Sequence, residues 1–181
     1  MLKYFGNCAS LFDWDSIIKD LEQQTPAYIG PSHKEGDNIV GLDSVTTLWK
    51  NSGYRNWYEG GTVGWDMFLS GINFDESIAV KFGEFVGVEN YTSCWISRIH
   101  QGMFAPQHWD VNDNEKELSA QPDRIRFHCH IDKPRWGHVL IVDDQCFYNQ
   151  TQGDIWQWSS RKLWHAGSNC GLVPKYLFNF W

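Results

Sequence analysis

The stretch Arg124-Ile-Arg-Phe-His-Cys-His-Ile131 alternates polar and apolar side chains over eight residues. Because successive side chains of a strand point to opposite faces of a sheet, Arg126, His128 and His130 would share one face. Six more segments are short, rich in β-branched and aromatic residues, and bounded by Gly, Pro, Asn or Asp: 91–99, 138–142, 146–148, 155–158, 163–166 and 175–181. Seven strands at this spacing predict a mostly β protein built as an antiparallel sandwich or barrel.

The first half of the chain has a different pattern, which predicts helices joined by loops. Residues 76–86 form the clearest candidate, with Asp75 as the N-cap and Gly87 just past the end. Their apolar side chains recur at helical spacing, at positions 78, 79, 82, 85 and 86. One shorter candidate begins after Asp13 or Asp15 and ends before Pro26. Another spans 44–50.

The length and composition are those of one globular domain. With 181 residues, 42% hydrophobic and 20% charged, the chain is long enough to bury a core. We therefore expect a single domain over 1–181, in which a helical region, 1–90, packs on one sheet of a β core formed by 91–181. The aromatic content of 16% fits a strand-rich core first and a ligand pocket second.

Charge and cysteine content exclude several classes of function. Fifteen Lys and Arg against 22 Asp and Glu give a net charge of −7, which disfavours binding to nucleic-acid phosphates. The five cysteines are odd in number and include no CxxC pair, so we expect reduced thiols in a cytoplasmic protein. No run of roughly 18 apolar residues occurs, so no membrane span is expected.

The segment Gln107-His108-Trp109-Asp110, together with His165, has the residue types of a metal site. A His and an Asp two positions apart near the end of a strand point to the same side. A second His from a distant strand would complete a face of two imidazoles and one carboxylate, the ligand set of non-haem Fe(II) oxygenases. Taken alone, however, a surface-loop histidine beside an acid is the simpler interpretation of His108.

Lys175 follows His165 by ten positions and adds a cation to this set. It would be placed to pair with the distal carboxylate of a dicarboxylate co-substrate bound to the metal. Lysine is otherwise rare at the start of an apolar strand such as 176–181. The alternative is an ordinary surface lysine at the end of a strand.

The stretch Ser97-Arg-Ile-His-Gln-Gly-Met-Phe-Ala-Pro-Gln-His-Trp-Asp110 resembles the segment that enters the metal site of the 2-oxoglutarate/Fe(II)-dependent dioxygenases. It is most similar to the aspartyl/asparaginyl β-hydroxylase family, which also contains bacterial cis-proline hydroxylases. The remaining motifs follow in the order of that family: Arg124-x-Arg126-x-His128, a turn at Gly153, His165 and Lys175. The resemblance covers roughly 91–181 and implies a double-stranded β-helix, a cupin-like jelly roll.

This resemblance also implies a role for each matched residue. The iron ligands would be His108, Asp110 and His165. The 2-oxoglutarate contacts would be Lys175 at the distal carboxylate, with Arg126, His128 and Ser97 as further contacts. The implied enzyme uses Fe(II), 2-oxoglutarate and O2 to hydroxylate a C–H bond of an amino acid, free or in a peptide or protein, releasing succinate and CO2.

Three features depart from the family pattern. Asp110 supplies a carboxylate ligand that the animal aspartyl hydroxylases lack, Lys175 stands where Arg is commoner, and 111–123 is an insertion. Two other functions stay open: a cupin-like metal-binding protein or oxygenase that does not use 2-oxoglutarate, and a non-catalytic interaction module on the same barrel. As partners we expect a small molecule or a peptide, and neither nucleic acid nor membrane.

Overall fold

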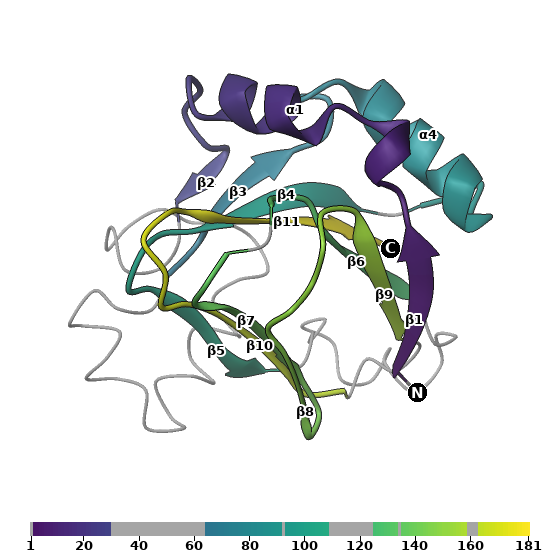
Figure 1. Ribbon diagram of the computed structural model, residues 1–181. Coiled ribbons are helices and arrows are strands. Elements are labelled where there is room, and N and C mark those ends of the chain that lie inside the picture. Colours follow the sequence, from purple (N-terminus) through teal and green to yellow (C-terminus); the bar gives the residue numbers. More distant parts are fainter. Residues whose placement is uncertain (1, 30–63, 92, 109–124, 134, 159–162) are drawn as a thin grey trace, which may run out of the picture.

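Figure 1 shows the computed structural model, which describes residues 2–29, 64–91, 93–108, 125–133, 135–158 and 163–181. The helices are η1 (Ala9–Leu11, a 3-10 turn), α1 (Trp14–Leu21) and α4 (Glu76–Val86). The strands are β1 (Leu2–Asn7), β2 (Tyr28–Ile29), β3 (Asp66–Leu69), β4 (Cys94–Ile99), β5 (Phe104–His108), β6 (Arg126–His130), β7 (His138–Val142), β8 (Gln145–Phe147), β9 (Asp154–Trp158), β10 (His165–Asn169) and β11 (Lys175–Phe180).

The strands form two antiparallel sheets that face each other. The large sheet has the order β1-β9-β6-β11-β4-β3-β2 and the small sheet the order β5-β10-β7-β8. From β4 onward the chain passes back and forth between the sheets, so that β4, β6, β9 and β11 form the centre of one and β5, β7, β8 and β10 the other. This interleaving of eight strands is the jelly roll, or double-stranded β-helix. The predicted fold class is therefore confirmed.

All seven predicted strands are present, with ends shifted by a few residues, but four strands were not predicted. In β1, Gly6 interrupts the pattern where the register against β9 shifts between Tyr4 and Gly6. In β5, Pro106 resembles a turn signal, yet β5 is an edge strand, where proline is tolerated. The short strands β2 and β3 extend the large sheet beyond β4, so the first half of the chain is not purely helical. The helix expected at 44–50 lies outside the described residues.

Helices α1 and α4 lie side by side on the outer face of the large sheet (Figure 1). Each begins at a predicted aspartate: Asp13 accepts from the Ser16 N–H at 3.1 Å, and Asp75 accepts from the Ser77 N–H at 2.8 Å. Helix α4 ends at Gly87, whose φ of 74° favours glycine. The prediction that helices pack on one sheet is thus confirmed.

The two faces of the large sheet differ sharply in polarity. Toward the helices it presents a continuous apolar core, to which β6 and β11 contribute Phe127, Cys129, Tyr176, Phe178 and Phe180. Toward the small sheet the alternate positions of the same strands carry buried polar groups: Arg126, His128, His130, Lys175 and Asn179. The main hydrophobic core is therefore outside the barrel, and much of the barrel interior is polar.

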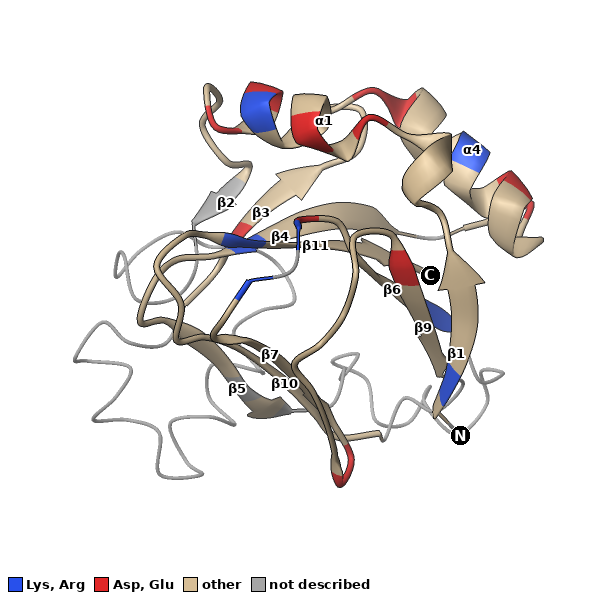
Figure 2. Cartoon of the chain, in the orientation of Figure 1, with Lys and Arg blue, Asp and Glu red and all other residues tan. Residues whose placement is uncertain are grey.

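Charge on the outside is concentrated away from the sheets. Figure 2 shows red and blue segments gathered on α1 and α4, with most of the strands uncharged. None of the described helices has the length and apolar content needed to cross a bilayer.

The helix–sheet core predicts a large stability effect for Phe178→Ala. Phe178 is fully buried, and its ring lies 4.7 Å from Phe82 and 5.7 Å from Trp14, measured between centroids. Its truncation should lower the free energy of unfolding by about 3–5 kcal/mol in urea titrations. Trp136, which is 94% exposed, is the matched control, and Trp136→Ala should change that value by less than about 0.5 kcal/mol. Equal effects of the two substitutions would contradict this core.

Candidate active site

Two of the three predicted metal ligands lie opposite each other in the small sheet. His165 is the first residue of β10 and pairs with His108, the last residue of β5, in antiparallel register. Directly paired residues in such a ladder have Cα atoms about 4.5–5.5 Å apart. The third predicted ligand, Asp110, lies two residues beyond β5, outside the described residues.

The His165 imidazole has the tautomer of a metal ligand. Its Nδ1 lies 3.2 Å from the Leu163 carbonyl oxygen, which only accepts, so Nδ1 carries the proton. Its Nε2 lies 3.1 Å from Nη1 of Arg126, which only donates, so Nε2 presents a lone pair inside the barrel. Metal-bound histidines commonly donate their second N–H to a backbone carbonyl in this way.

Arg126 is held between aromatic rings at this end of the barrel. Its guanidinium carbon lies 4.0 Å from the ring centroid of Trp181, 5.8 Å from that of Trp95 and 5.9 Å from that of Trp158. Such stacking stabilises a cation that is 5% exposed. The Trp158 ring also lies 5.5 Å from that of His165. Trp158, which is buried in a small apolar cluster with Leu140 and Val142, thus also forms a wall of the site.

Lys175 is the most unusual charge in the structure. It is fully buried, and its Nζ donates to the Val139 carbonyl oxygen at 2.6 Å. Within the described part of the chain no carboxylate forms a salt bridge with it, and burial lowers its pKa to about 8. A Cβ added at Gly167 would lie 3.9 Å from Nζ, so this amine is beside β10, two residues along from His165. A buried ammonium of this kind is stabilised by an anion.

Ser97 and His128 are joined by a residue that the sequence analysis missed. The Nδ2 of Asn179 donates to Ser97 Oγ at 3.1 Å and to the Leu177 carbonyl oxygen at 3.3 Å. Its Oδ1 therefore accepts, and the Nδ1–H of His128 donates to it at 3.0 Å. The only available signal was the alternation of β11, which places Asn179 on the same face as Lys175.

This network fixes what His128 can offer to a ligand. Burial, together with the nearby positive charges, lowers its pKa well below 6.5, so the imidazole is neutral. With the proton on Nδ1, the buried Nε2 is a lone-pair acceptor without a hydrogen-bond partner among the described residues. A carboxylate placed at Nε2 would need a proton between the two atoms.

A second group of ligand-type residues, not predicted as a site, lies at the other end of β6. His130, Asp132 and His138 are all buried and bring one potential metal-ligating atom each to within 4.8 Å of one another. Burial raises the pKa of the Asp132 carboxyl, but its contacts with the two histidines outweigh this and bring it to about 2. The His130-x-Asp132 spacing, which repeats that of His108-x-Asp110, was the signal that could have revealed it.

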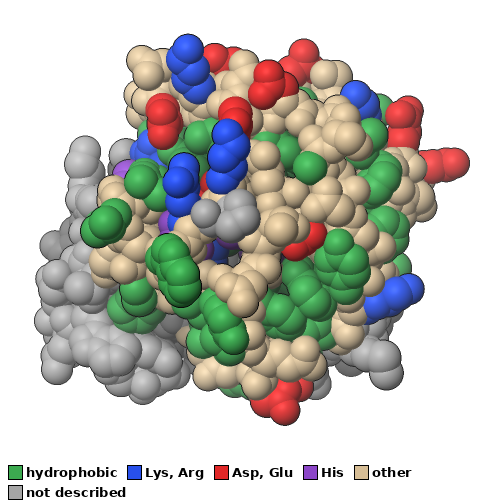
Figure 3. Space-filling view, viewed as in Figure 1, with side chains coloured by type: hydrophobic (Ala, Val, Ile, Leu, Met, Phe, Trp, Pro, Cys, Tyr) green, Lys and Arg blue, Asp and Glu red, His purple; other side chains and the backbone are tan. Residues whose placement is uncertain are grey.

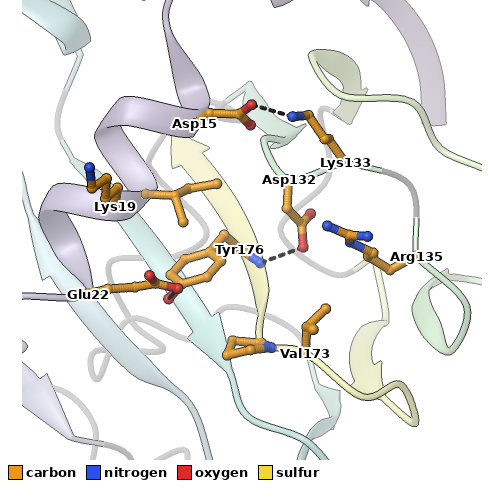
Figure 4. A pocket seen from close by; sticks show the side chains of 10 residues that line it. Asp15, Lys19, Glu22, Asp132, Lys133, Arg135, Val173 and Tyr176 are labelled. Atoms are coloured by element: carbon orange, nitrogen blue, oxygen red, sulfur yellow. Dashed lines mark hydrogen bonds and ion pairs between the residues drawn. The ribbon is translucent and has the colours of Figure 1, made fainter.

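The carboxylate of Asp132 also borders a pocket of about 290 Å³ on the helix side of the large sheet. Figure 4 shows its wall formed by Asp15 and Lys19 of α1 and by Glu22 just past the end of that helix, with Lys133 beside Asp15 and the Arg135 side chain extending toward Asp132. In the space-filling view some Lys and Arg side chains lie close together below α1, and others lie at the top and right edges (Figure 3).

No protein-family model matches the chain, and no match is found among curated protein sequences. Among solved structures, the viral collagen prolyl hydroxylase of Paramecium bursaria Chlorella virus-1, in complex with 2-oxoglutarate, is 15% identical with a TM-score of 0.49. That match covers 79% of this chain and 92% of the viral one. The prolyl hydroxylase of Trichoplax adhaerens, bound to a hypoxia-inducible-factor peptide, is 15% identical with a TM-score of 0.47, covering 96% and 89%.

A predicted oxalate decarboxylase of Thermotoga maritima is 9% identical with a TM-score of 0.40, covering 65% of this chain and 78% of its own. The neighbours thus include prolyl hydroxylases, one of them in complex with 2-oxoglutarate, as well as a predicted oxalate decarboxylase. At these levels of similarity the fold of this chain is defined by its strand order, and its activity has to be argued from its own residues.

The tautomer of His128 can be observed directly. Because its pKa is lowered, the imidazole should remain neutral, with the proton on Nδ1, between pH 8 and pH 6. Two-bond ¹⁵N–¹H correlation spectra, assigned with His128→Gln, report both the charge and the tautomer. A charged imidazole or an Nε2–H form at pH 7 would contradict the network through Asn179.

Proposed function

We propose that this protein is a 2-oxoglutarate- and Fe(II)-dependent hydroxylase that oxidises a C–H bond of an amino acid, free or in a peptide or protein. The observation that carries the proposal is Lys175, an ammonium fully buried inside the barrel with no carboxylate paired to it in the described residues. It lies beside the strand that begins with His165. A dicarboxylate that chelates a metal at His165 would bring its distal carboxylate toward this amine.

The pairing of β5 with β10 supports an iron site. His108 and His165 are cross-strand partners, and the Nε2 of His165 carries a lone pair whose tautomer is fixed by Leu163. Asp110 would supply the carboxylate of the set. When bound, Fe(II) with 2-oxoglutarate and O2 supplies the oxidising equivalent, and succinate and CO2 are the co-products.

The protein's own residues would bind, orient and shield. Lys175 would hold the distal carboxylate of 2-oxoglutarate as a point charge, and Arg126 would add a second cation near the metal-binding end of the barrel. Ser97, fixed by Asn179, would provide a hydroxyl contact. His128 would contact a carboxylate of the co-substrate through Nε2 when that nitrogen gains a proton, because both groups otherwise only accept. Trp158 would exclude water from the side of His165.

The motif order of 97–110, Arg126-x-His128, His165 and Lys175 supports placing the protein nearest the aspartyl/asparaginyl β-hydroxylases and cis-proline hydroxylases. On that basis the substrate is an amino acid or a peptide side chain. The second candidate is a cupin-like oxygenase or metal-binding protein that does not use 2-oxoglutarate, in which Lys175 and Arg126 would have only structural roles.

Turnover distinguishes the two candidates. The protein, reconstituted anaerobically with Fe(II) and then given 2-oxoglutarate and O2, should release succinate in proportion to hydroxylated product from a panel of amino acids and peptides. His108→Ala and Asp110→Ala should abolish this release. Lys175→Met should weaken 2-oxoglutarate binding about 10- to 100-fold, because a buried charge-assisted hydrogen bond is lost.

Lys133→Met is the matched control for Lys175→Met. Lys133 is an exposed lysine whose partner is Asp15 on the surface, so its loss should leave 2-oxoglutarate binding unchanged. Equal effects of the two substitutions, or metal binding without any succinate release across the panel, would favour the second candidate.

The affinity for 2-oxoglutarate should depend on pH in a direction set by Lys175. Its pKa is lowered to about 8, and only the ammonium form attracts a carboxylate. Affinity should therefore be constant below about pH 8, fall by up to tenfold per pH unit above it, and level off above the higher pKa that Lys175 has in the bound state. Quenching of tryptophan fluorescence by 2-oxoglutarate in the presence of Mn(II), without O2, measures this. In Lys175→Arg the affinity for 2-oxoglutarate should stay constant up to a higher pH. If affinity in that variant falls over the same pH range as in the unchanged protein, the titrating group is not Lys175.

A further inference from the structure

The buried group His130, Asp132 and His138 joins three segments at the end of β6 that is remote from Arg126. His130 is the last residue of β6 and His138 the first of β7, with Asp132 in the loop between them. The Nε2 of His130 lies 3.0 Å from Oδ1 of Asp132, and Nδ1 of His138 lies 3.1 Å from Oδ2. The exposed fractions of the three residues are 3%, 7% and 4%.

The contacts of the two ring nitrogens of His138 require a positive charge beside Asp132. Its Nε2 lies 3.2 Å from the Val173 carbonyl oxygen, which only accepts, so Nε2 carries a proton. A neutral imidazole has one N–H, so Nδ1 then presents a lone pair to Asp132 Oδ2, which is another acceptor. Two acceptors 3.1 Å apart in a buried site require a positive charge between them, either a second imidazole proton or a metal ion.

We propose that His130, Asp132 and His138 bind a divalent metal ion of the zinc class, at a site separate from His108, Asp110 and His165. Such an ion lies 2.0–2.2 Å from imidazole nitrogen and carboxylate oxygen, which places neighbouring ligand atoms roughly 3.0–3.4 Å apart. The two nitrogen–oxygen distances of 3.0 and 3.1 Å match this spacing. With the proton of His130 on Nδ1, one ion would bind a lone pair from each imidazole and the carboxylate together, whereas a proton on His138 serves a single contact.

The surroundings of the three residues support a metal. The Nε2–H of His138 donates to the Val173 carbonyl, and the Tyr176 N–H donates to Asp132 Oδ2 at 3.2 Å. Outer contacts of this kind orient ligands in metal sites. The pocket of about 290 Å³ that Asp132 borders gives a route for the ion from the helix side (Figure 4).

The effect of the ion would be structural. It would tie the β6–β7 loop to Val173 and Tyr176, the residues on either side of the turn into Lys175. Both contacts exist already as hydrogen bonds to His138 and Asp132. The ion would therefore stabilise the start of β11.

The test uses the full chain with its other candidate metal site removed. His108→Ala/His165→Ala is dialysed against Zn(II) and then against buffer, and zinc is counted by elemental analysis. We expect one zinc per chain, and X-ray absorption of that zinc should show two imidazole ligands. His138→Gln in the same background should lower zinc affinity at least 100-fold.

His100→Gln is the matched control, because His100 Nε2 also faces a carboxylate oxygen, Asp66 Oδ2 at 2.7 Å, but belongs to another cluster. It should leave zinc binding unchanged. Absence of zinc in the double variant would overturn the proposal and identify the network as an imidazolium–carboxylate pair, and zinc that survives His138→Gln would place the ion elsewhere. If His138→Gln does not fold, the ligand set from X-ray absorption decides alone. None of these outcomes depends on succinate release.

Discussion

The strict alternation of side chains along β6 and β11 is the constraint on which the rest of the structure depends. These two strands lie next to each other at the centre of the large sheet, with Leu177 paired to His130 and Asn179 to His128. One set of alternate positions is aromatic or aliphatic and is covered by α1 and α4. The other set is polar apart from Leu177 and faces the small sheet. A shift of one residue in this register would expose the aromatic set to the barrel and bury Lys175 under the helices.

The apolar side chains that stabilise the fold and the polar side chains of the candidate site therefore lie in different layers. The layer between the helices and the large sheet carries most of the apolar contacts, including the fully buried Phe82, Phe127 and Phe178. Among the described residues, the layer between the sheets has a smaller apolar cluster, whose buried members are Leu140, Val142 and Trp158. Because the first layer holds the fold together, the second can contain groups such as Arg126 and Lys175 that would weaken an ordinary core.

Features that are local in sequence could be predicted. The shared face of Arg126 and His128 followed from alternation, and the starts of α1 and α4 followed from Asp13 and Asp75 as N-caps. Features that depend on distant partners could not. The contact between Trp158 and His165 cannot be read from the pattern of β9 alone, and Asn179 became visible only through its bonds to β4 and β6. Strand β5 was missed because Pro106 is compatible with a strand only at an edge, which is a property of the sheet.

In the candidate site a side-chain cation already contacts the ring nitrogen of His165. The guanidinium of Arg126 donates to the lone pair of His165, the same electron pair that a metal would take, while the indoles of Trp181, Trp95 and Trp158 hold it there. On the proposed function, an ion that binds at His165 would compete with this guanidinium for one electron pair. The affinity measured for a metal would then be the difference between two competing cations.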